Sequence, residues 1–169
     1  NFEAALEALG YDDISGDGQV QTALIEIVTV LDVSNQSISD IAGIEDFVAL
    51  ISLNCEDNSL TNLDVSNNTN LQTLIFDNNN VATLALGGNT NLDSIEGRYN
   101  QLASIDLSQN TNLTFINLRD NLFTTIDVSN NTLLETINLR TCTNLTSLDL
   151  ANNSSLEQLY LQDCGLNSL

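Results

Sequence analysis

A leucine opens a new sequence unit every 21 residues along most of this chain. Leu50, Leu71, Leu92, Leu113 and Leu134 start successive units, and each neighbouring pair is separated by 21 residues. A fixed period of this length is typical of repeat architectures, in which each unit packs only on its neighbours. The chain is therefore predicted to form one elongated repeat domain.

Each unit contains two halves of similar pattern, LxxLxLxxN and then LxxLDLSxNT, with Val, Ile, Phe or Cys also allowed at the leucine positions. The L-x-L alternation points two side chains inward from a short strand and leaves the residue between them in solvent. A helix cannot be built from this pattern. We predict a flattened right-handed coil in which each unit forms one turn, with neighbouring turns paired as parallel strands about 4.8 Å apart.

Asparagine recurs at the end of both halves of the unit. An inward amide at a bend can bond the otherwise unpaired peptide groups of neighbouring turns, which an alanine could not do. The first column consists of Asn58, Asn79, Asn100 and Asn121, and the second of Asn68, Asn89, Asn110, Asn131 and Asn153.

These patterns resemble a known family. LxxLxLxxNxL is similar to the leucine-rich-repeat signature, and the segments LDVSNNTNL (63–71) and IDVSNNTLL (126–134) resemble the nested 21-residue repeats of secreted Bacteroidetes proteins. The segment LDVSNQSISDIAGIEDF (31–47) resembles an internalin-like first repeat, and NFEAALEALGYDD (1–13) resembles the amino-terminal cap. The resemblance covers roughly residues 28–169. It implies a mainly β, leucine-rich-repeat right-handed solenoid that is extracellular or at the cell surface, with a non-catalytic recognition role.

The chain divides into a predicted helical cap over residues 1–27 and a solenoid of about six and a half turns over residues 28–169. In the cap, Phe2, Leu6 and Leu9 have helical spacing and Gly10 ends the helix. The first repeat (28–49) has 22 residues and is expected to contain a short 3₁₀ turn in ISDIAGIEDF. One extra residue near Thr143 predicts a wider bend in the sixth turn. The sequence stops in the middle of the repeat pattern, so a longer protein is expected to continue it.

Charge excludes several functions. The 23 acidic residues face only 3 basic ones, and the net charge of −20 argues against nucleic acid and against an anionic membrane surface. No apolar run reaches the roughly 18 residues of a membrane span, so membrane insertion is not expected. The absence of histidine removes Ser-His-Asp and Cys-His catalysis and the common zinc sites. Paired carboxylates could still cleave a polysaccharide, but no turn departs from the repeat to build a cleft, so we predict no enzyme.

All three basic residues fall in one outward column, which runs Glu56, Asp77, Arg98, Arg119, Arg140 and Gln162. Arginines stacked on neighbouring strands repel one another and need compensation. One interpretation is that Asp77, Glu96, Asp120 and Asp163 neutralise a column copied by repeat duplication, and that the solenoid is a passive stalk of an adhesin.

The other interpretation is a binding strip, in which guanidinium groups grip carboxylate or sulfate groups and aromatic rings add contact area. Its partner would be an extracellular protein or a polysaccharide. The candidate ligand-binding residues are Arg98, Tyr99, Phe115, Asn117, Arg119, Asn138, Arg140 and Tyr160.

Calcium is the only cofactor that the sequence suggests. Asp13, Ser15 and Asp17 in DDISGDGQV match the first half of an EF-hand loop, but the twelfth position is Leu24 instead of the bidentate glutamate. A simple surface turn is the competing interpretation. A second acidic column follows the other half of each unit and allows either calcium bridging or a solvated face. Its members are Asp32, Asp64, Asp106, Asp127 and Asp149.

The three cysteines do not form a disulfide framework. Cys55 takes an inward leucine position and is expected to be a buried thiol. Cys142 and Cys164 take the first asparagine column in adjacent turns, where either a bridge or two free thiols would fit by distance. We favour the free thiols.

Overall fold

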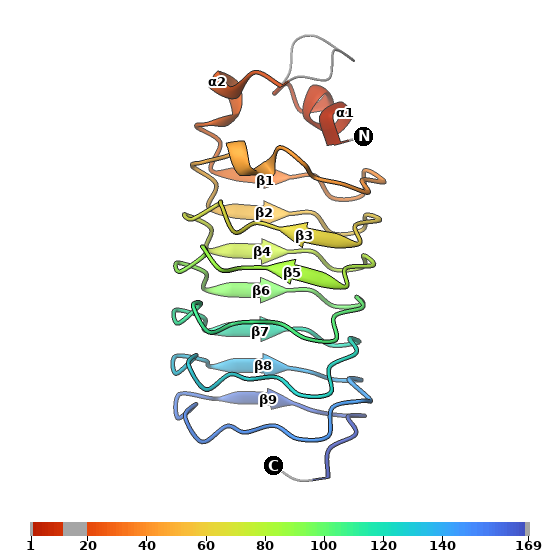
Figure 1. Ribbon diagram of the computed structural model, residues 1–169, viewed down its shortest axis with the longest axis vertical. Helices are drawn as coiled ribbons and strands as arrows, with labels where there is room; N and C mark the ends of the chain where they lie inside the picture. The colour runs from red at the N-terminus through yellow and green to blue at the C-terminus, as the bar shows by residue number, and fades with distance from the viewer. Residues whose placement is uncertain (1, 12–19, 168–169) are drawn as a thin grey trace.

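The computed structural model describes residues 2–11 and 20–167, and these form a solenoid whose turns stack along one axis (Figure 1). One side of the solenoid is a parallel sheet of seven short strands in the order β1-β2-β4-β6-β7-β8-β9. The strands are β1 (Val30–Asp32), β2 (Ser52–Asn54), β4 (Thr73–Ile75), β6 (Ser94–Glu96), β7 (Phe115–Asn117), β8 (Thr136–Asn138) and β9 (Gln158–Tyr160). The predicted β-solenoid is therefore confirmed.

The register of this sheet follows the sequence period. Leu53 pairs with Leu74, Leu74 with Ile95, and Ile95 with Ile116, so the central inward residue of each strand lies on that of the next turn. These side chains are completely buried. A one-residue slip would turn every leucine to solvent, so burial fixes the register.

The other side of the solenoid forms far less sheet than the repeat pattern predicts. Only β3 (Asn62–Asp64) and β5 (Thr83–Ala85) pair there among the described residues. Later turns run extended on this side and are joined by isolated backbone bonds, such as the one from Gln101 N to Val81 O at 2.9 Å. The expectation of a strand in every half-unit was wrong on this side.

The first asparagine column joins the turns from inside. Asn100 Oδ1 accepts the N–H of Val81, and Asn100 Nδ2 donates to the carbonyls of Phe76, Gly97 and Arg98 at 3.0–3.3 Å. Asn79 and Asn121 make equivalent sets of bonds. The predicted role of these amides is confirmed, because each satisfies peptide groups of two turns.

The second column uses only half of each amide. Asn110 Nδ2 donates to Asn89 O at 2.8 Å and to Leu86 O at 3.2 Å. Five buried Oδ1 atoms of this column accept no hydrogen bond from the described residues, namely those of Asn68, Asn89, Asn110, Asn131 and Asn153. The hydrogen bonds donated by Nδ2 therefore explain why asparagine occupies this column, whereas the Oδ1 atoms contribute no bond that would explain it.

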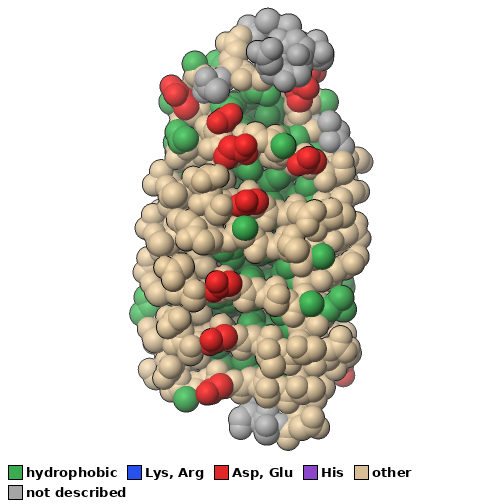
Figure 2. Space-filling view, viewed as in Figure 1, with side chains coloured by type: hydrophobic (Ala, Val, Ile, Leu, Met, Phe, Trp, Pro, Cys, Tyr) green, Lys and Arg blue, Asp and Glu red, His purple; other side chains and the backbone are tan. Residues whose placement is uncertain are grey.

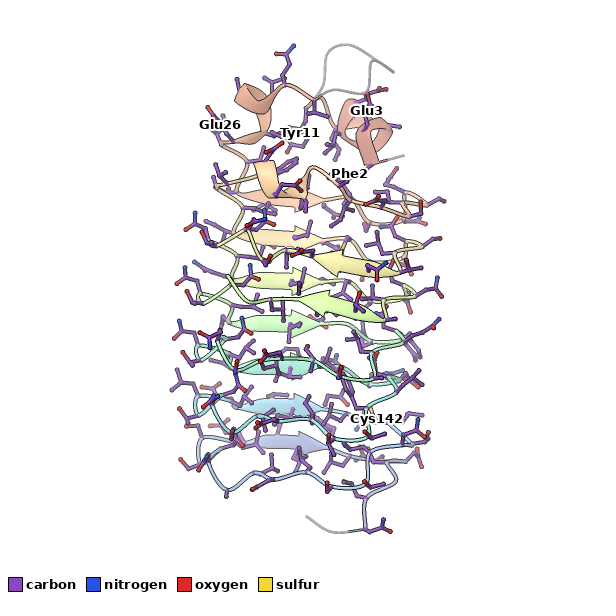
Figure 3. All side chains as sticks on the ribbon, viewed as in Figure 1. Phe2, Glu3, Tyr11, Glu26 and Cys142 are labelled. Carbon is purple, nitrogen blue, oxygen red and sulfur yellow. The ribbon has the colours of Figure 1, made fainter. Side chains whose placement is uncertain are left out.

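The amino-terminal cap begins with helix α1 (Phe2–Ala8), which covers the first turn (Figure 3). Gly10 ends it with a left-handed φ of +80°, and Tyr11 N donates to Leu6 O at 2.9 Å, a common helix stop. The Phe2 ring lies 6.4 Å from that of Phe47. Phe2 and Leu6, two of the three apolar residues with helical spacing, are buried, whereas Leu9 follows the helix and is 49% exposed. A second short helix, α2 (Thr22–Ile25), was not predicted.

The two predicted irregularities in the repeats are present. The 3₁₀ helix η1 (Ile44–Asp46) lies in the first repeat, where Ile44 and Phe47 are buried. The extra residue of the sixth turn is absorbed in a bend around Cys142, where Leu145 N donates to Cys142 O at 2.9 Å. The next strand pairs with an offset of one residue more, Thr136 with Gln158, so the sheet continues unbroken.

Candidate functional site

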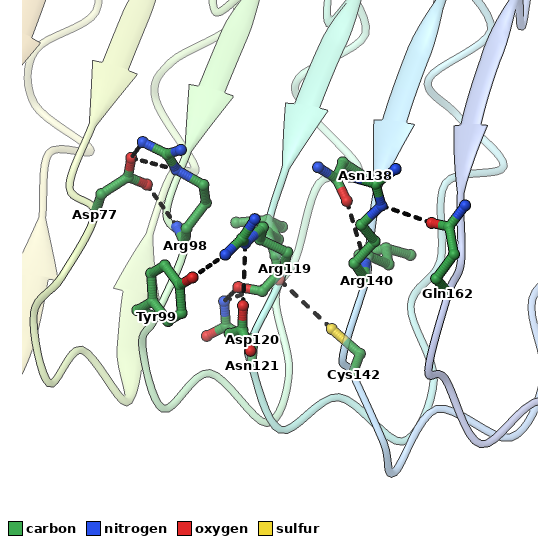
Figure 4. A network of polar contacts seen from close by, with 12 residues as sticks. Asp77, Arg98, Tyr99, Arg119, Asp120, Asn121, Asn138, Arg140, Cys142 and Gln162 are labelled. Carbon is green, nitrogen blue, oxygen red and sulfur yellow. Dashed lines mark hydrogen bonds and ion pairs between the residues drawn. The ribbon is translucent and has the colours of Figure 1, made fainter.

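The three arginines lie side by side just after strands β6, β7 and β8, on the outer face of the seven-stranded sheet (Figure 4). The sheet register places them in one column because each follows its strand by two residues. Their neighbours differ from turn to turn, so each guanidinium has a different environment.

Arg98 is neutralised by Asp77 of the preceding turn. Asp77 is completely buried, and its carboxylate accepts from Arg98 Nε at 2.6 Å, from Nη2 at 2.5 Å and from the backbone N–H of Arg98 at 2.6 Å. The hydrogen bond to Asp77 raises the pKa of the Arg98 guanidinium. Because a buried carboxylate depends on its cation, Arg98 serves the fold at this position.

Arg119 has one carboxylate and one aromatic partner. Its Nε donates to Asp120 Oδ2 at 3.0 Å, its Nη2 donates to the Tyr99 hydroxyl, and its Cζ lies 4.7 Å from the centre of the Tyr99 ring. The pair is accessible, since the Tyr99 residue is 46% exposed. Cation and ring together form a contact surface of the type found at interface hot spots.

Tyr99 occupies a backbone position that does not suit it. The same position in each turn has φ between +53° and +61°, and it holds Asn35, Asp57, Asn78, Tyr99, Asp120, Thr141 and Asp163. Asn and Asp tolerate this left-handed conformation, whereas in bulky and β-branched residues it is sterically strained. Strain of this kind concentrates at functional sites. Tyr99 therefore contacts Arg119 from a backbone position whose strain an asparagine would not carry.

Arg140 has only neutral partners among the described residues. Its Nε donates to Gln162 Oε1 at 2.6 Å, and its Cζ lies 4.6 Å from the centre of the Tyr160 ring. Its backbone N–H bonds Asn138 Oδ1 at 3.2 Å. Arg98 and Arg119 therefore each have a carboxylate partner, as the first interpretation of the sequence expected. In the described part of the chain, no carboxylate lies within 4.0 Å of Arg140.

The remaining candidates lie on the same sheet face but differ in exposure. Phe115 begins β7, two columns away from the arginines, and does not contact them through any described interaction. Asn117 ends β7 and is only 8% exposed, and its Oδ1 accepts no hydrogen bond from the described residues. Gln162, which was not among the candidates, is the residue that fixes Arg140. Its place in the arginine column was the signal for it.

The opposite side of the solenoid is acidic. Figure 2 shows acidic side chains in a line down the face on which β3 and β5 lie, with no arginine visible there. These carboxylates are engaged by their own turns: bonds from the Ser66 hydroxyl and N–H lower the pKa of Asp64, and bonds from Ser108 and Ser129 lower the pKa of Asp106 and Asp127. Each of these three carboxylates therefore has a hydrogen-bond partner within its own turn.

Asp13, Ser15 and Asp17, for which the sequence allows either a calcium loop or a simple surface turn, lie outside the described part of the chain. Within residues 2–11 and 20–167, no three His, Cys, Asp or Glu residues group as metal ligands. No helix in these ranges is long and apolar enough to cross a membrane.

Cys142 and Cys164 continue the first asparagine column as free thiols, and Cys142 is labelled in Figure 3. Cys142 Sγ bonds Leu118 O at 3.5 Å, and Cys164 Sγ bonds Leu139 O at 2.9 Å. The asparagines make the same bond to the preceding turn. Burial raises the pKa of Cys142 to about 11 and that of Cys55 to about 12, so both stay protonated at neutral pH.

Comparison with known proteins places this solenoid among solved leucine-rich-repeat structures. No protein-family model matches the sequence, and no curated protein matches it. The functional domain of InlJ from Listeria monocytogenes is similar over 99% of this chain, with 33% identity and a TM-score of 0.87. That domain includes a cysteine ladder, and Cys142 and Cys164 stack in adjacent turns here. This chain spans 36% of the InlJ domain, so about a third of its length is compared.

Two further structures share the fold at lower identity. A leucine-rich-repeat protein of Leptospira interrogans matches 86% of this chain and 46% of its own, with 22% identity and a TM-score of 0.70. Internalin C2 of Listeria monocytogenes matches 99% of this chain and 85% of its own, with 20% identity and a TM-score of 0.57. The chain therefore has a leucine-rich-repeat solenoid fold of the kind seen in internalin-like proteins. A Bacteroidetes origin is not indicated by these structures.

Proposed function

We propose that this chain is a non-catalytic, extracellular or cell-surface recognition module that binds a partner protein through the outer face of the seven-stranded sheet. The binding strip consists of Tyr99, Arg119, Arg140 and Tyr160, supported by Asn138. The observation that supports it most is the pairing of two arginines with two partly exposed aromatic rings on one face of an otherwise acidic chain. Residues of these types dominate the energetics of protein interfaces.

The proposed strip leaves out Arg98. Arg98 is excluded because removing it would strand the buried Asp77 carboxylate, which would lower stability for reasons unrelated to a partner. A useful binding variant therefore changes Arg119 and Arg140 and leaves Arg98 in place.

An array of purified extracellular proteins and acidic polysaccharides, probed with the wild-type chain in calcium and in chelator, tests the proposal. We expect a specific signal on protein spots, and we expect the double change Arg119→Gln, Arg140→Gln to reduce it at least tenfold with an unchanged thermal midpoint. The same signal from the folded double variant would contradict the strip. A specific signal confined to polysaccharide spots would contradict a protein partner, and no specific signal on any spot would favour a passive stalk.

Tyr99→Asn is predicted to separate stability from binding. Relief of the left-handed strain should raise the free energy of unfolding by about 1 kcal/mol, offset in part by loss of the Arg119 contact. Affinity for a protein found on the array should fall at least tenfold, because the exposed ring is lost. Denaturant titration and surface plasmon resonance measure the two quantities.

Thr141→Asn is the matched control, since it relieves the same backbone position two turns further along. It should stabilise the chain by a similar amount and leave affinity within about threefold. If Tyr99→Asn binds as well as the wild type, Tyr99 is not part of the recognition surface.

A further inference from the structure

We propose that Arg140, Tyr160 and Gln162 form a subsite for one carboxylate of the partner protein, supplied by an aspartate or glutamate side chain. The inference rests on the proposed function and names the chemistry that its surface would recognise. The three arginines share one column, but only Arg98 and Arg119 have a carboxylate partner, whereas the Nε of Arg140 donates to the neutral amide of Gln162.

The sequence explains why Arg140 alone lacks a carboxylate. Arg98 takes its counter-ion from the same column one turn earlier, at Asp77, and Arg119 takes its own from the next residue, Asp120. For Arg140 those two positions hold Arg119 and Thr141. The following turn offers Gln162, whose amide oxygen is a neutral acceptor. In the described part of the chain, Arg140 is therefore the one arginine with neither of these counter-ions.

The guanidinium is nevertheless held in place. The Tyr160 ring covers one of its faces, and Gln162 accepts from Nε. Tyr160 is itself fixed, since its hydroxyl donates to Gln158 Oε1 at 2.8 Å. Neither Nη atom donates to another described residue, so both remain for a ligand. Two parallel N–H donors in a plane match the two oxygens of a carboxylate, and a fixed side chain loses little entropy on binding.

Two observations favour a carboxylate from a protein over a uronic acid in a polysaccharide. The face of Tyr160 that could stack on a sugar is partly taken by Arg140, as that of Tyr99 is by Arg119. A polyanion would also be repelled along its length by a chain of net charge −20. A single carboxylate on a neutral or basic protein surface avoids that repulsion.

Nuclear magnetic resonance can observe this subsite directly, because the chain contains three arginines and no lysine. The ¹⁵N–¹H spectrum of the arginine Nε groups therefore holds three signals; the single variants Arg119→Gln and Arg140→Gln assign two of them, and the third belongs to Arg98. The probe is N-acetyl-aspartyl amide, titrated against the full chain at constant ionic strength. N-acetyl-asparaginyl amide is the neutral control, and glucuronate is a separate arm.

We expect a saturable shift of the Arg140 signal with the aspartyl probe, at least fivefold larger than that of Arg98, and no shift with the asparaginyl control. Thr141→Asp should weaken probe binding at least tenfold, because it gives Arg140 the neighbouring carboxylate that Arg119 already has in Asp120. Thr141→Asn, which changes the same position without charge, should bind the probe as the wild type does.

Equal, unsaturable shifts at all three arginines, or full probe binding by Thr141→Asp, would overturn the subsite. Tighter binding of glucuronate than of the aspartyl probe would overturn its assignment to a protein partner. A protein found on the array that still needs Arg119 and Tyr99 would leave the proposed function intact in either case, so the two failures are distinguishable.

Discussion

Replacing Gly97 by leucine should destabilise this solenoid by more than about 3 kcal/mol, although leucine is the consensus residue at its position. The inward column at this point runs Cys55, Phe76, Gly97, Leu118 and Leu139. A Cβ atom on Gly97 would lie 2.1 Å from Cζ of Phe76, so the Phe76 ring fills the space that a side chain at Gly97 would occupy. The large residue in one turn and the glycine in the next are therefore a compensated pair.

The double variant Phe76→Leu, Gly97→Leu tests the compensation. Phe76→Leu alone should cost about 1–3 kcal/mol by opening a cavity, and the double variant should recover most of both losses. Gly87→Ala is the control, because a Cβ there meets nothing within 4 Å. Urea unfolding followed by circular dichroism gives the free energies of unfolding of the wild type, the two single variants, the double variant and the control. Additive losses in the double variant would show that Phe76 and Gly97 do not share one space.

Asn100→Ala is expected to cost about 4 kcal/mol, the second large effect. The substitution removes four hydrogen bonds and leaves one N–H and three carbonyls without that partner inside the solenoid. Each buried polar group that is left unpaired costs about 1–3 kcal/mol, with part regained by relaxation. Thermal and urea unfolding measure the loss.

Asn112→Ala provides the comparison within the same repeat unit, 92–112. Asn112 is exposed, and its amide makes a single bond to Thr90 O at 2.9 Å, so its loss should cost less than about 1 kcal/mol. Similar costs for Asn100 and Asn112 would contradict the account of the inner ladder, because burial and bond number would then have no effect.

Sequence periodicity was sufficient to predict the solenoid, because a 21-residue repeat of inward leucines admits one register. Leu53, Leu74 and Ile95 lie where the pattern requires. The repeat pattern places Gly97 in an inward column but does not reveal its partnership with Phe76, since periodicity describes each column and not the side-chain volumes within it. The loss of strands opposite the main sheet was missed because the L-x-L pattern occurs in the second half of every unit, in turns that pair there and in turns that do not.

The position of the candidate site was predicted from the sequence, but the different partner of each arginine was not. One column for Arg98, Arg119 and Arg140 follows from the period alone. Their separate partners depend on which neighbouring turn supplies a carboxylate, which is a matter of side-chain direction. The strain at Tyr99 was also invisible in the sequence pattern, because it requires the left-handed φ that the asparagines and aspartates of this position share.

The central claim, that one face of the solenoid recognises a protein, is tested most directly by comparing affinities of two matched variants for a protein found on the array. Arg119→Gln, Arg140→Gln changes the face of the seven-stranded sheet, and Asp106→Asn, Asp127→Asn changes the opposite face by the same number of charges. We predict at least a tenfold loss of affinity, about 1.4 kcal/mol, for the first and less than about a threefold change for the second. Equal losses, or a loss confined to the second variant, would contradict the claim.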